Sequence, residues 1–133
     1  MDDYLLDTNA VSALLKGNKP NVTQRSDGIA LQKQFIPSIV RAELWFGWQN
    51  SPHHVSRLND LRRFLAGFPT LPFDDAAAEE YGKLRAYLSR VGLPIGPNDL
   101  MIASIALAND LVLVTHNTGE FSRVPGLRIE DWQ

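Results

Sequence analysis

The amino-acid sequence predicts an α/β fold in which a parallel sheet lies between layers of helices. Short apolar runs that are typical of buried strands alternate along the chain with longer segments whose apolar residues repeat at helical spacing. The chain has 133 residues, about the usual size of one domain, and its 44% hydrophobic and 21% charged residues are those of an average globular protein. We therefore expect a single domain over residues 1–133.

The first half of the chain shows these strand and helix signals in alternation. Asn9 and Ser38 each follow an apolar run and belong to the residue types that cap helices. Pro20 suits the first turn of another helix, and residues 53–68 place apolar side chains on one helical face. The expected elements are, in order, strand 4–8, helix 10–16, a helix from residue 20, strand 34–38, helix 39–48 and helix 53–68.

The second half contains the strongest helix signal of the chain, at residues 74–92. This segment has an acidic first turn, a basic last turn and a glycine at its end. The run LVLVT at residues 111–115 is the clearest buried strand. The expected elements are, in order, strand 70–73, helix 74–92, a helix from residue 97, strand 111–115 and strand 126–132.

Composition and charge exclude several classes of protein. The chain has no cysteine, so it contains neither a disulfide nor a thiolate zinc site. Its acidic N-terminus has too short an apolar run for a signal peptide, and no apolar stretch reaches membrane-spanning length, so we expect a cytoplasmic protein without membrane contact. The net charge of −2 argues against a surface coated with basic residues, although it leaves a nucleic-acid enzyme possible.

Three acidic residues lie at positions where a folded chain rarely leaves a charge unpaired. Asp7 ends the first strand, Glu43 lies mid-helix between apolar neighbours, and Asp99 opens a helix whose next nine residues include a single polar side chain. A carboxylate beside a buried face should be paired or bound to a metal. Ligands of open parallel sheets bind beyond the carboxyl ends of the strands, where Asp7 is expected. The three residues together therefore indicate a site for a hard divalent cation such as Mg²⁺.

Each of these acids also has an ordinary structural explanation, which the sequence leaves open. Asp99 favours the positive end of a helix dipole, Glu43 could pair with Arg41 or another arginine, and Asp7 could cap the following helix. His116 follows the last buried strand, but a lone histidine is more often structural than catalytic.

Four stretches of the sequence together resemble a known family. LLDTNAVSALL, SIVRAELWFG, GLPIGPNDLMIASIAL and LVLVTHNTGEFSRVPGLRIEDW are similar to the corresponding parts of PIN-domain ribonucleases, and most of all to the VapC toxins of bacterial toxin–antitoxin pairs. The resemblance implies a PIN-like three-layer fold. It also implies an endoribonuclease that depends on Mg²⁺, or on Mn²⁺, and that hydrolyses RNA phosphodiester bonds. The alternative is a PIN-fold module that binds RNA or a partner without cleaving.

The resemblance also assigns roles to individual residues. Asp7, Glu43 and Asp99 occupy the family's acidic, metal-binding and catalytic positions. Many PIN domains have a further aspartate after the last buried strand, where this chain has Asn117, with Glu120 three residues later. We expect Asn117 to orient water near the metal and Glu120 to be a weaker candidate that pairs with Arg123. Thr8 is expected to position the carboxylate of Asp7 or to touch a phosphate.

The family further implies partners. These are a VapB-type antitoxin, an RNA substrate expected to be tRNA (initiator tRNA above all), a second copy of the chain in a homodimer, and operator DNA only through the antitoxin. Leu44, Trp45, Phe46 and Trp48 lie on one short helix and cannot all point inward. They form either a large core or, together with residues 58–68, an apolar groove for a partner helix.

Overall fold

A five-stranded sheet forms the centre of the computed structural model, which describes residues 2–51 and 54–133 and, within the second range, no side chains of residues 54–56. The strand order is β3-β2-β1-β4-β5, and every neighbouring pair is parallel. The strands are β1 (Tyr4–Leu6), β2 (Gln34–Pro37), β3 (Thr70–Leu71), β4 (Val112–Val114) and β5 (Ile129–Glu130).

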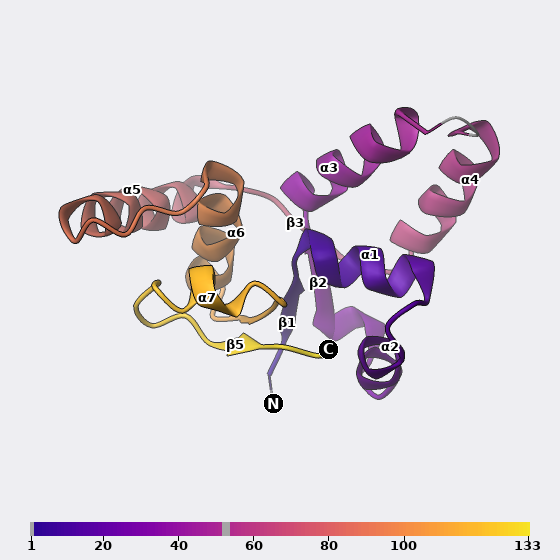
Figure 1. Cartoon of the computed structure of the whole chain (residues 1–133), viewed down its shortest axis with the longest axis horizontal. Coiled ribbons are helices and arrows are strands. Elements are labelled where there is room, and N and C mark those ends of the chain that lie inside the picture. Colours follow the sequence, from indigo (N-terminus) through magenta and orange to yellow (C-terminus); the bar gives the residue numbers. More distant parts are fainter. Residues whose placement is uncertain (1, 52–53) are drawn as a thin grey trace.

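Helices cover both faces of this sheet, as the alternation of signals predicts. Figure 1 shows α1 to α4 on one side of the strands and α5 to α7 on the other. The helices are α1 (Thr8–Lys16), α2 (Pro20–Asp27), α3 (Ser38–Gln49), α4 (His54–Leu65), α5 (Asp75–Arg90), α6 (Pro97–Ala108) and α7 (Thr118–Phe121), and a short 3₁₀ helix spans Leu31–Lys33.

The order of the strands creates a switch point beside β1. From β1 the chain adds β2 and then β3 on one side, and it then crosses to β4 and β5 on the other side of β1. The connections that leave β1 and β4 therefore run in opposite directions. In open α/β sheets a crevice forms at such a point, beyond the carboxyl ends of the two strands. Residues that directly follow β1 and β4 border it.

The core explains why the central strands are apolar along their whole length. All three residues of β1 and all three of β4 are buried, as expected for strands with helices on both faces. Helix α6 is buried almost all round, with Leu100 and the run from Ile102 to Ala106 inaccessible to solvent. A helix of this kind packs inside the molecule, and it places its first turn beside the switch point.

Two of the expected caps are wrong. Helix α1 begins at Thr8, and its cap is Asp7 rather than Asn9, because the Asp7 Oδ1 accepts a hydrogen bond from the amide of Ala10 at 2.9 Å. Helix α3 begins at Ser38 itself, after Pro37, and no side chain caps it. Pro20 opens α2 as expected.

Other boundaries differ by a few residues. The strands are shorter than the apolar runs that predict them, and the one-turn helix α7 was not predicted. Helix α4 begins at His54, and residue 53 of the expected helix lies outside the described residues. Among the helices that are described, none has both the length and the apolar composition needed to cross a membrane.

Candidate active site

Asp7 joins the first strand to the first helix at the switch point. Its amide donates to the carbonyl of Val114 at 3.1 Å, so the backbone of Asp7 is fixed by the neighbouring strand β4. The side chain is only 4% exposed. Burial raises the pKa of Asp7, while hydrogen bonds from Thr115 and the amides of the first helical turn oppose that rise. Asp7 is therefore both a helix cap and a buried carboxylate at the crevice, so its two expected roles do not exclude each other.

Glu43 reaches the same crevice from α3. Its Oε2 accepts a hydrogen bond from the Thr8 hydroxyl at 2.7 Å, and its Oε1 accepts one from the Asn98 side-chain amide, also at 2.7 Å. Arg41 does not pair with it, because the Arg41 guanidinium donates to the carbonyls of Leu65 and Phe68. Thr8 thus orients the carboxylate of Glu43 rather than that of Asp7. The alternative of an ion pair between Glu43 and Arg41 is wrong.

Asp99 and Glu120 complete the acidic group from the other side of the sheet. Asp99 lies in the first turn of α6 and is half-buried. Burial is the largest cause of its raised pKa, about 6, and the negative charges of Glu120, Asp7 and Glu43 raise it further. Glu120, Asp7 and Glu43 therefore all lie close enough to act on the charge of Asp99, although the four acids come from four different parts of the chain.

Glu120 is held by the candidate residue Asn117 and by the amide of Gly96, which the sequence did not indicate. Its Oε1 accepts from the amide of Gly96 and its Oε2 from the Asn117 side chain, both at 2.9 Å. Burial acts to raise the pKa of Glu120, but Gly96, Asn117 and the nearby charge of Arg123 outweigh it, so the pKa is lowered. Asp99 and Glu120 also share a hydrogen bond, which contributes to raising the pKa of Asp99 and to lowering the pKa of Glu120.

The expected ion pair between Glu120 and Arg123 is wrong. The Arg123 guanidinium donates to the carbonyl of Pro94 at 3.1 Å, and no salt bridge within 4 Å joins it to Glu120. Arg123 affects Glu120 only as a nearby charge. Glu120 therefore faces Asp99, which makes it a stronger site candidate than the sequence indicated.

His116 lies outside this acidic group. Its Nδ1 is 2.9 Å from the Asp131 Oδ2, and the histidine side chain is 59% exposed. This contact holds the ring beside the C-terminal residues, so His116 does not take part in the hydrogen bonds among the acids.

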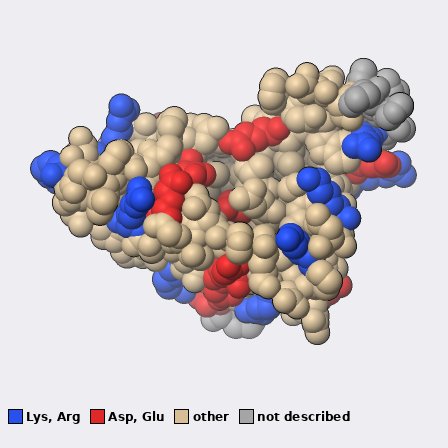
Figure 2. All heavy atoms as spheres, viewed as in Figure 1, with Lys and Arg blue, Asp and Glu red and all other residues tan. Residues whose placement is uncertain are grey.

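The chemistry of the group suits a hard cation. In the described residues, no lysine or arginine lies within 4 Å of Asp7, Glu43, Asp99 or Glu120. The side-chain groups that face one another are carboxylates, amides and hydroxyls. Their oxygen atoms are the ligand type that Mg²⁺ and Mn²⁺ prefer. Figure 2 shows acidic side chains gathered around the hollow between α3 and the α6–α7 side of the molecule. An uncompensated cluster of carboxylates with this donor set fits a divalent cation.

The carboxylates are not yet gathered around one point. No three His, Cys, Asp or Glu side chains of the described residues form a group that could hold a metal ion as they stand. Thr8 and Asn98 each donate to one oxygen of Glu43, and Gly96 and Asn117 each donate to one oxygen of Glu120.

Asn98 and Thr115 are the site residues that sequence reasoning missed. Each had a signal. Asn98 stands next to Asp99 in the first turn of α6, and Thr115 follows β4 as Asp7 follows β1. Because parallel strands end at the same edge of the sheet, the residue after β4 could have been expected to meet Asp7.

Comparison with known proteins agrees with this geometry. The family model of the PIN domain matches residues 4–127. The chain belongs to the PIN-domain family. It is 40% identical to the tRNA(fMet)-specific endonuclease VapC of Shigella flexneri over 129 residues, which cover 97% of each chain. VapC nucleases with this PIN domain are generally metal-dependent.

Solved structures of PIN-domain proteins share the fold over nearly the whole length. DNA-bound VapBC from Salmonella typhimurium contains a chain with a TM-score of 0.92 and 37% identity, and the match covers 100% of both chains. VapBC2 from Rickettsia felis, bound to a DNA fragment from its promoter, gives a TM-score of 0.90 and 35% identity over 98% of both chains. The expected PIN-like three-layer fold and the resemblance to VapC ribonucleases are thereby confirmed.

Proposed function

We propose that this chain is the toxin of a type II toxin–antitoxin pair and acts as a Mg²⁺-dependent endoribonuclease. The observation that carries the proposal is the meeting of four carboxylates, from four parts of the chain, at the switch point of a PIN-domain sheet without a basic partner in the described residues. Relatives that cover 97% of the chain are named as tRNA(fMet)-specific endonuclease and ribonuclease VapC. An acidic site in this family is best explained by metal-assisted cleavage of RNA.

Each site residue has a distinct task in this proposal. Asp7, Glu43 and Asp99 hold the cation, and Glu120 is the fourth carboxylate of the site. The cation, Mg²⁺ or alternatively Mn²⁺, supplies Lewis-acid polarisation of the phosphoryl oxygen and lowers the pKa of a water molecule. Asn117 orients Glu120 through its 2.9 Å hydrogen bond, and an amide at this position also suits the orientation of water.

The residues that surround the carboxylates fix their positions before substrate arrives. Thr8 and Asn98 orient Glu43, while Thr115 and the amide of Ala10 orient Asp7. Water attacks the phosphodiester in line, and the products are a 5′-phosphate and a 3′-hydroxyl. No side chain of the protein acts as a nucleophile. The substrate is tRNA, with initiator tRNA first among the candidates, and such a substrate places the protein in the cytoplasm.

The outer surface of α3 is the proposed contact for a VapB-type antitoxin. Phe46 is 71% exposed, and Trp45 and Trp48 lie partly buried beneath Arg62 and Arg57, whose guanidinium carbons are 5.3 and 5.4 Å from the ring centroids. Exposed aromatic residues of this kind favour a partner surface.

A hollow connects this aromatic surface to the acidic group. Its volume is about 290 Å³, and its lining includes both Trp48 and Glu43. A segment of the antitoxin seated there reaches Glu43, and a basic side chain of that segment neutralises the acids. The DNA-bound structures of the relatives contain VapBC. In this proposal, operator DNA contacts the present chain only through its antitoxin.

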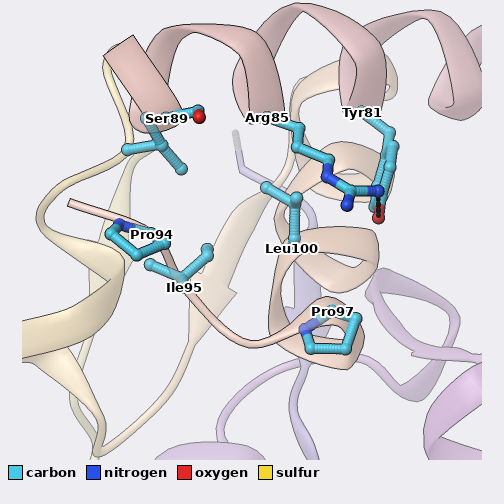
Figure 3. A pocket seen from close by; sticks show the side chains of 8 residues that line it. Tyr81, Arg85, Ser89, Pro94, Ile95, Pro97 and Leu100 are labelled. Atoms are coloured by element: carbon cyan, nitrogen blue, oxygen red, sulfur yellow. Dashed lines mark hydrogen bonds between the residues drawn. The ribbon is translucent and has the colours of Figure 1, made fainter. Parts of the chain in front are cut away.

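A homodimer is the proposed assembly of two copies, through the face formed by α5 and the loop that follows it. Tyr87, Val91 and Leu93 are 39%, 46% and 45% exposed there. Beside them lies a hollow of about 340 Å³ between α5 and α6. Figure 3 shows Pro94, Ile95, Pro97 and Leu100 in its wall, with Arg85 donating to the Tyr81 hydroxyl at 3.3 Å. A largely apolar face of this kind suits self-association.

Cleavage of RNA in the presence and absence of metal tests the proposed function. Purified chain freed of antitoxin is incubated with total RNA in Mg²⁺, in Mn²⁺ and in EDTA, and the new 5′ ends are sequenced. We expect cleavage at few sites, in tRNA, that stops in EDTA. Binding of RNA without cleavage in either metal would instead support a non-catalytic PIN-fold binding module, and cleavage that persists in EDTA would contradict the metal site.

A further inference from the structure

A separate hollow, lined by lysines rather than by carboxylates, lies beside the acidic group. Its volume is about 340 Å³, and it lies between α1, the turn that follows α1, and the segment after β4. Asn9 at one border is two residues beyond Asp7, and His116 at another border stands between Thr115 and Asn117. We call this the basic hollow, and the polar and basic residues that line it are Asn9, Ser12, Lys16, Asn18, Lys19, His116 and Gln133.

The two lysines of the basic hollow form no ion pairs with the described residues. Lys16 and Lys19 are exposed, and neither forms a salt bridge or a side-chain hydrogen bond with any of the described residues. Other basic residues do form such pairs, among them Arg63 with Asp60 and Lys83 with Glu80. Figure 2 shows basic side chains over the end of α1, on the same face of the molecule as the acidic group.

The backbone fixes where the two lysines lie. Gly17 ends α1 in the left-handed conformation, at φ 65°, and its amide donates to the carbonyl of Ala13 at 2.9 Å. The chain therefore turns sharply after Lys16, and Lys19 becomes the residue that precedes α2. Both lysines consequently line one hollow. His116 joins them because Asp131 holds its Nδ1, which leaves the other ring nitrogen free to face a ligand.

We propose that the basic hollow is a subsite for the phosphodiester backbone of RNA, next to the bond that is cleaved. The inference rests on the proposed ribonuclease function. Two ammonium groups, the side-chain amides and the Ser12 hydroxyl are donors to phosphate oxygens. Among the described residues, no Phe, Tyr or Trp lines the hollow to offer a base a large stacking surface, so the backbone rather than the bases is its ligand.

The position of the basic hollow relative to the acids supports this assignment. Lys16 lies nine residues beyond Asp7, which corresponds to about 13 Å along a helix. A phosphate at the lysines therefore belongs to a nucleotide only a few positions from the cleaved bond. Carboxylates repel RNA, and a neighbouring pair of lysines offsets that repulsion and aligns the strand with the site.

The test measures RNA binding as a function of salt. Lys16→Ala, Lys19→Ala and the double variant are made in a chain that carries Asp99→Asn, so that labelled single-stranded RNA is bound but not cut. Lys83→Ala on α5 is the control, because it removes the same charge from a distant surface. We expect each hollow variant to weaken binding roughly threefold to tenfold at low salt and to lower the slope of log K against log salt by about 1. Lys83→Ala should change neither.

Kinetics of the cleaving enzyme provide a second readout. In the chain with Asp99 intact, the lysine variants should raise KM for a long RNA and leave kcat unchanged. They should also leave cleavage of a dinucleotide unchanged, since it is too short to reach the hollow. An unchanged salt slope for the double variant, or an equal loss on long and short substrates, would overturn the subsite. Absence of cleavage by the unmodified chain would overturn the proposed function instead, and the binding measurement still decides the subsite.

Discussion

Both edges of the parallel sheet carry acidic residues, but the basic partners of these residues differ between the edges. At the amino edge, before β1, β4 and β5, Arg128 bonds to Asp2 at 2.6 Å and to Asp110 at 3.3 Å. At the carboxyl edge, no lysine or arginine of the described chain lies within 4 Å of Asp7 or Asp99. The fold thus pairs Asp2 and Asp110 with an arginine and leaves Asp7 and Asp99 without a basic partner in the described residues.

The pKa values follow this difference. The hydrogen bond from Arg128 lowers the pKa of Asp2, whereas burial and three neighbouring carboxylates raise the pKa of Asp99 to about 6. Paired acids stabilise the folded state, and crowded acids destabilise it. A chain that retains crowded acids at the switch point gives up stability there, which is typical of a functional site.

The largest effect is expected where an acid of the carboxyl edge loses its charge. Asp7→Asn and Asp99→Asn should each reduce RNA cleavage by roughly 100-fold or more, because the amide keeps the shape and removes a ligand charge. The measurement is the initial rate of cleavage in Mg²⁺. Asp110→Asn at the amino edge is the matched control and should cleave at the normal rate. Normal rates for either carboxyl-edge variant would contradict the assignment of those acids to the metal.

A smaller effect is expected at Glu120, and a smaller one still at Asn117. Glu120 touches Asp99, whereas Asn117 acts through its hydrogen bond to Glu120. Glu120→Gln should therefore raise the Mg²⁺ concentration needed for half-maximal cleavage by about tenfold, and Asn117→Ala by only a few-fold. A titration of activity against Mg²⁺ for each variant checks the order. A larger change in Asn117→Ala than in Glu120→Gln would show that Asn117 contacts the cation or its water directly.

Much of this arrangement could be predicted from the sequence. The apolar runs that form β1 and β4 and the acidic first turn of α5 are local signals, and they gave the strand–helix order and the place of Asp7. The apolar neighbours of Glu43 and Asp99 marked these two acids as candidates, and the family motifs assigned their roles. The structure brings these residues together at the switch point, and their binding of metal stays a prediction.

The helix cap and the partners of Glu120 could not be predicted, because more than one side chain could form each contact. Asp7 and Asn9 are both good caps, and the choice between them depends on how far the chain has turned when the strand ends. Likewise, the spacing of Glu120 and Arg123 suited an ion pair on a helix, but α7 ends at Phe121, and the Gly96 amide and Asn117 take the carboxylate instead. Contacts between residues 24 positions apart, such as Gly96 and Glu120, leave no local pattern.

The metal-free stability of Asp99→Asn should vary with pH in a defined direction. The folded-state pKa of Asp99 is above the unfolded value of 3.8, so its ionisation destabilises the folded state once the pH exceeds both values. In EDTA, Asp99→Asn should melt about 2–5 °C above the parent chain at pH 7 to 8. The difference should shrink as the pH falls from about 6 towards 4, where Asp99 becomes protonated in both states. Thermal melts across this range provide the measurement, and a difference that grows at low pH would contradict the crowding of Asp99.

The smallest effect, with the opposite sign, is expected at the amino edge. The pKa of Asp2 is lowered by the hydrogen bond from Arg128, so its ionised form stabilises the folded state at neutral pH. Asp2→Asn should therefore lower the melting temperature slightly, where Asp99→Asn raises it. The pair is solvent-exposed, so the loss should be small and should diminish in high salt.

The pH dependence of Asp2→Asn should also be the reverse of that at Asp99. The stabilisation by Asp2 is present above its unfolded pKa and disappears as the pH falls through its lowered folded pKa, so the parent and variant should converge in acid below about 3.8. Cleavage by Asp2→Asn should be unchanged at every pH, since Asp2 lies at the edge of the sheet opposite to the site. Thermal melts of Asp2→Asn and Asp99→Asn in the same buffers compare the two edges directly. If both variants moved the melting temperature in the same direction at pH 7, the two edges would not differ in the way that their ion pairs indicate.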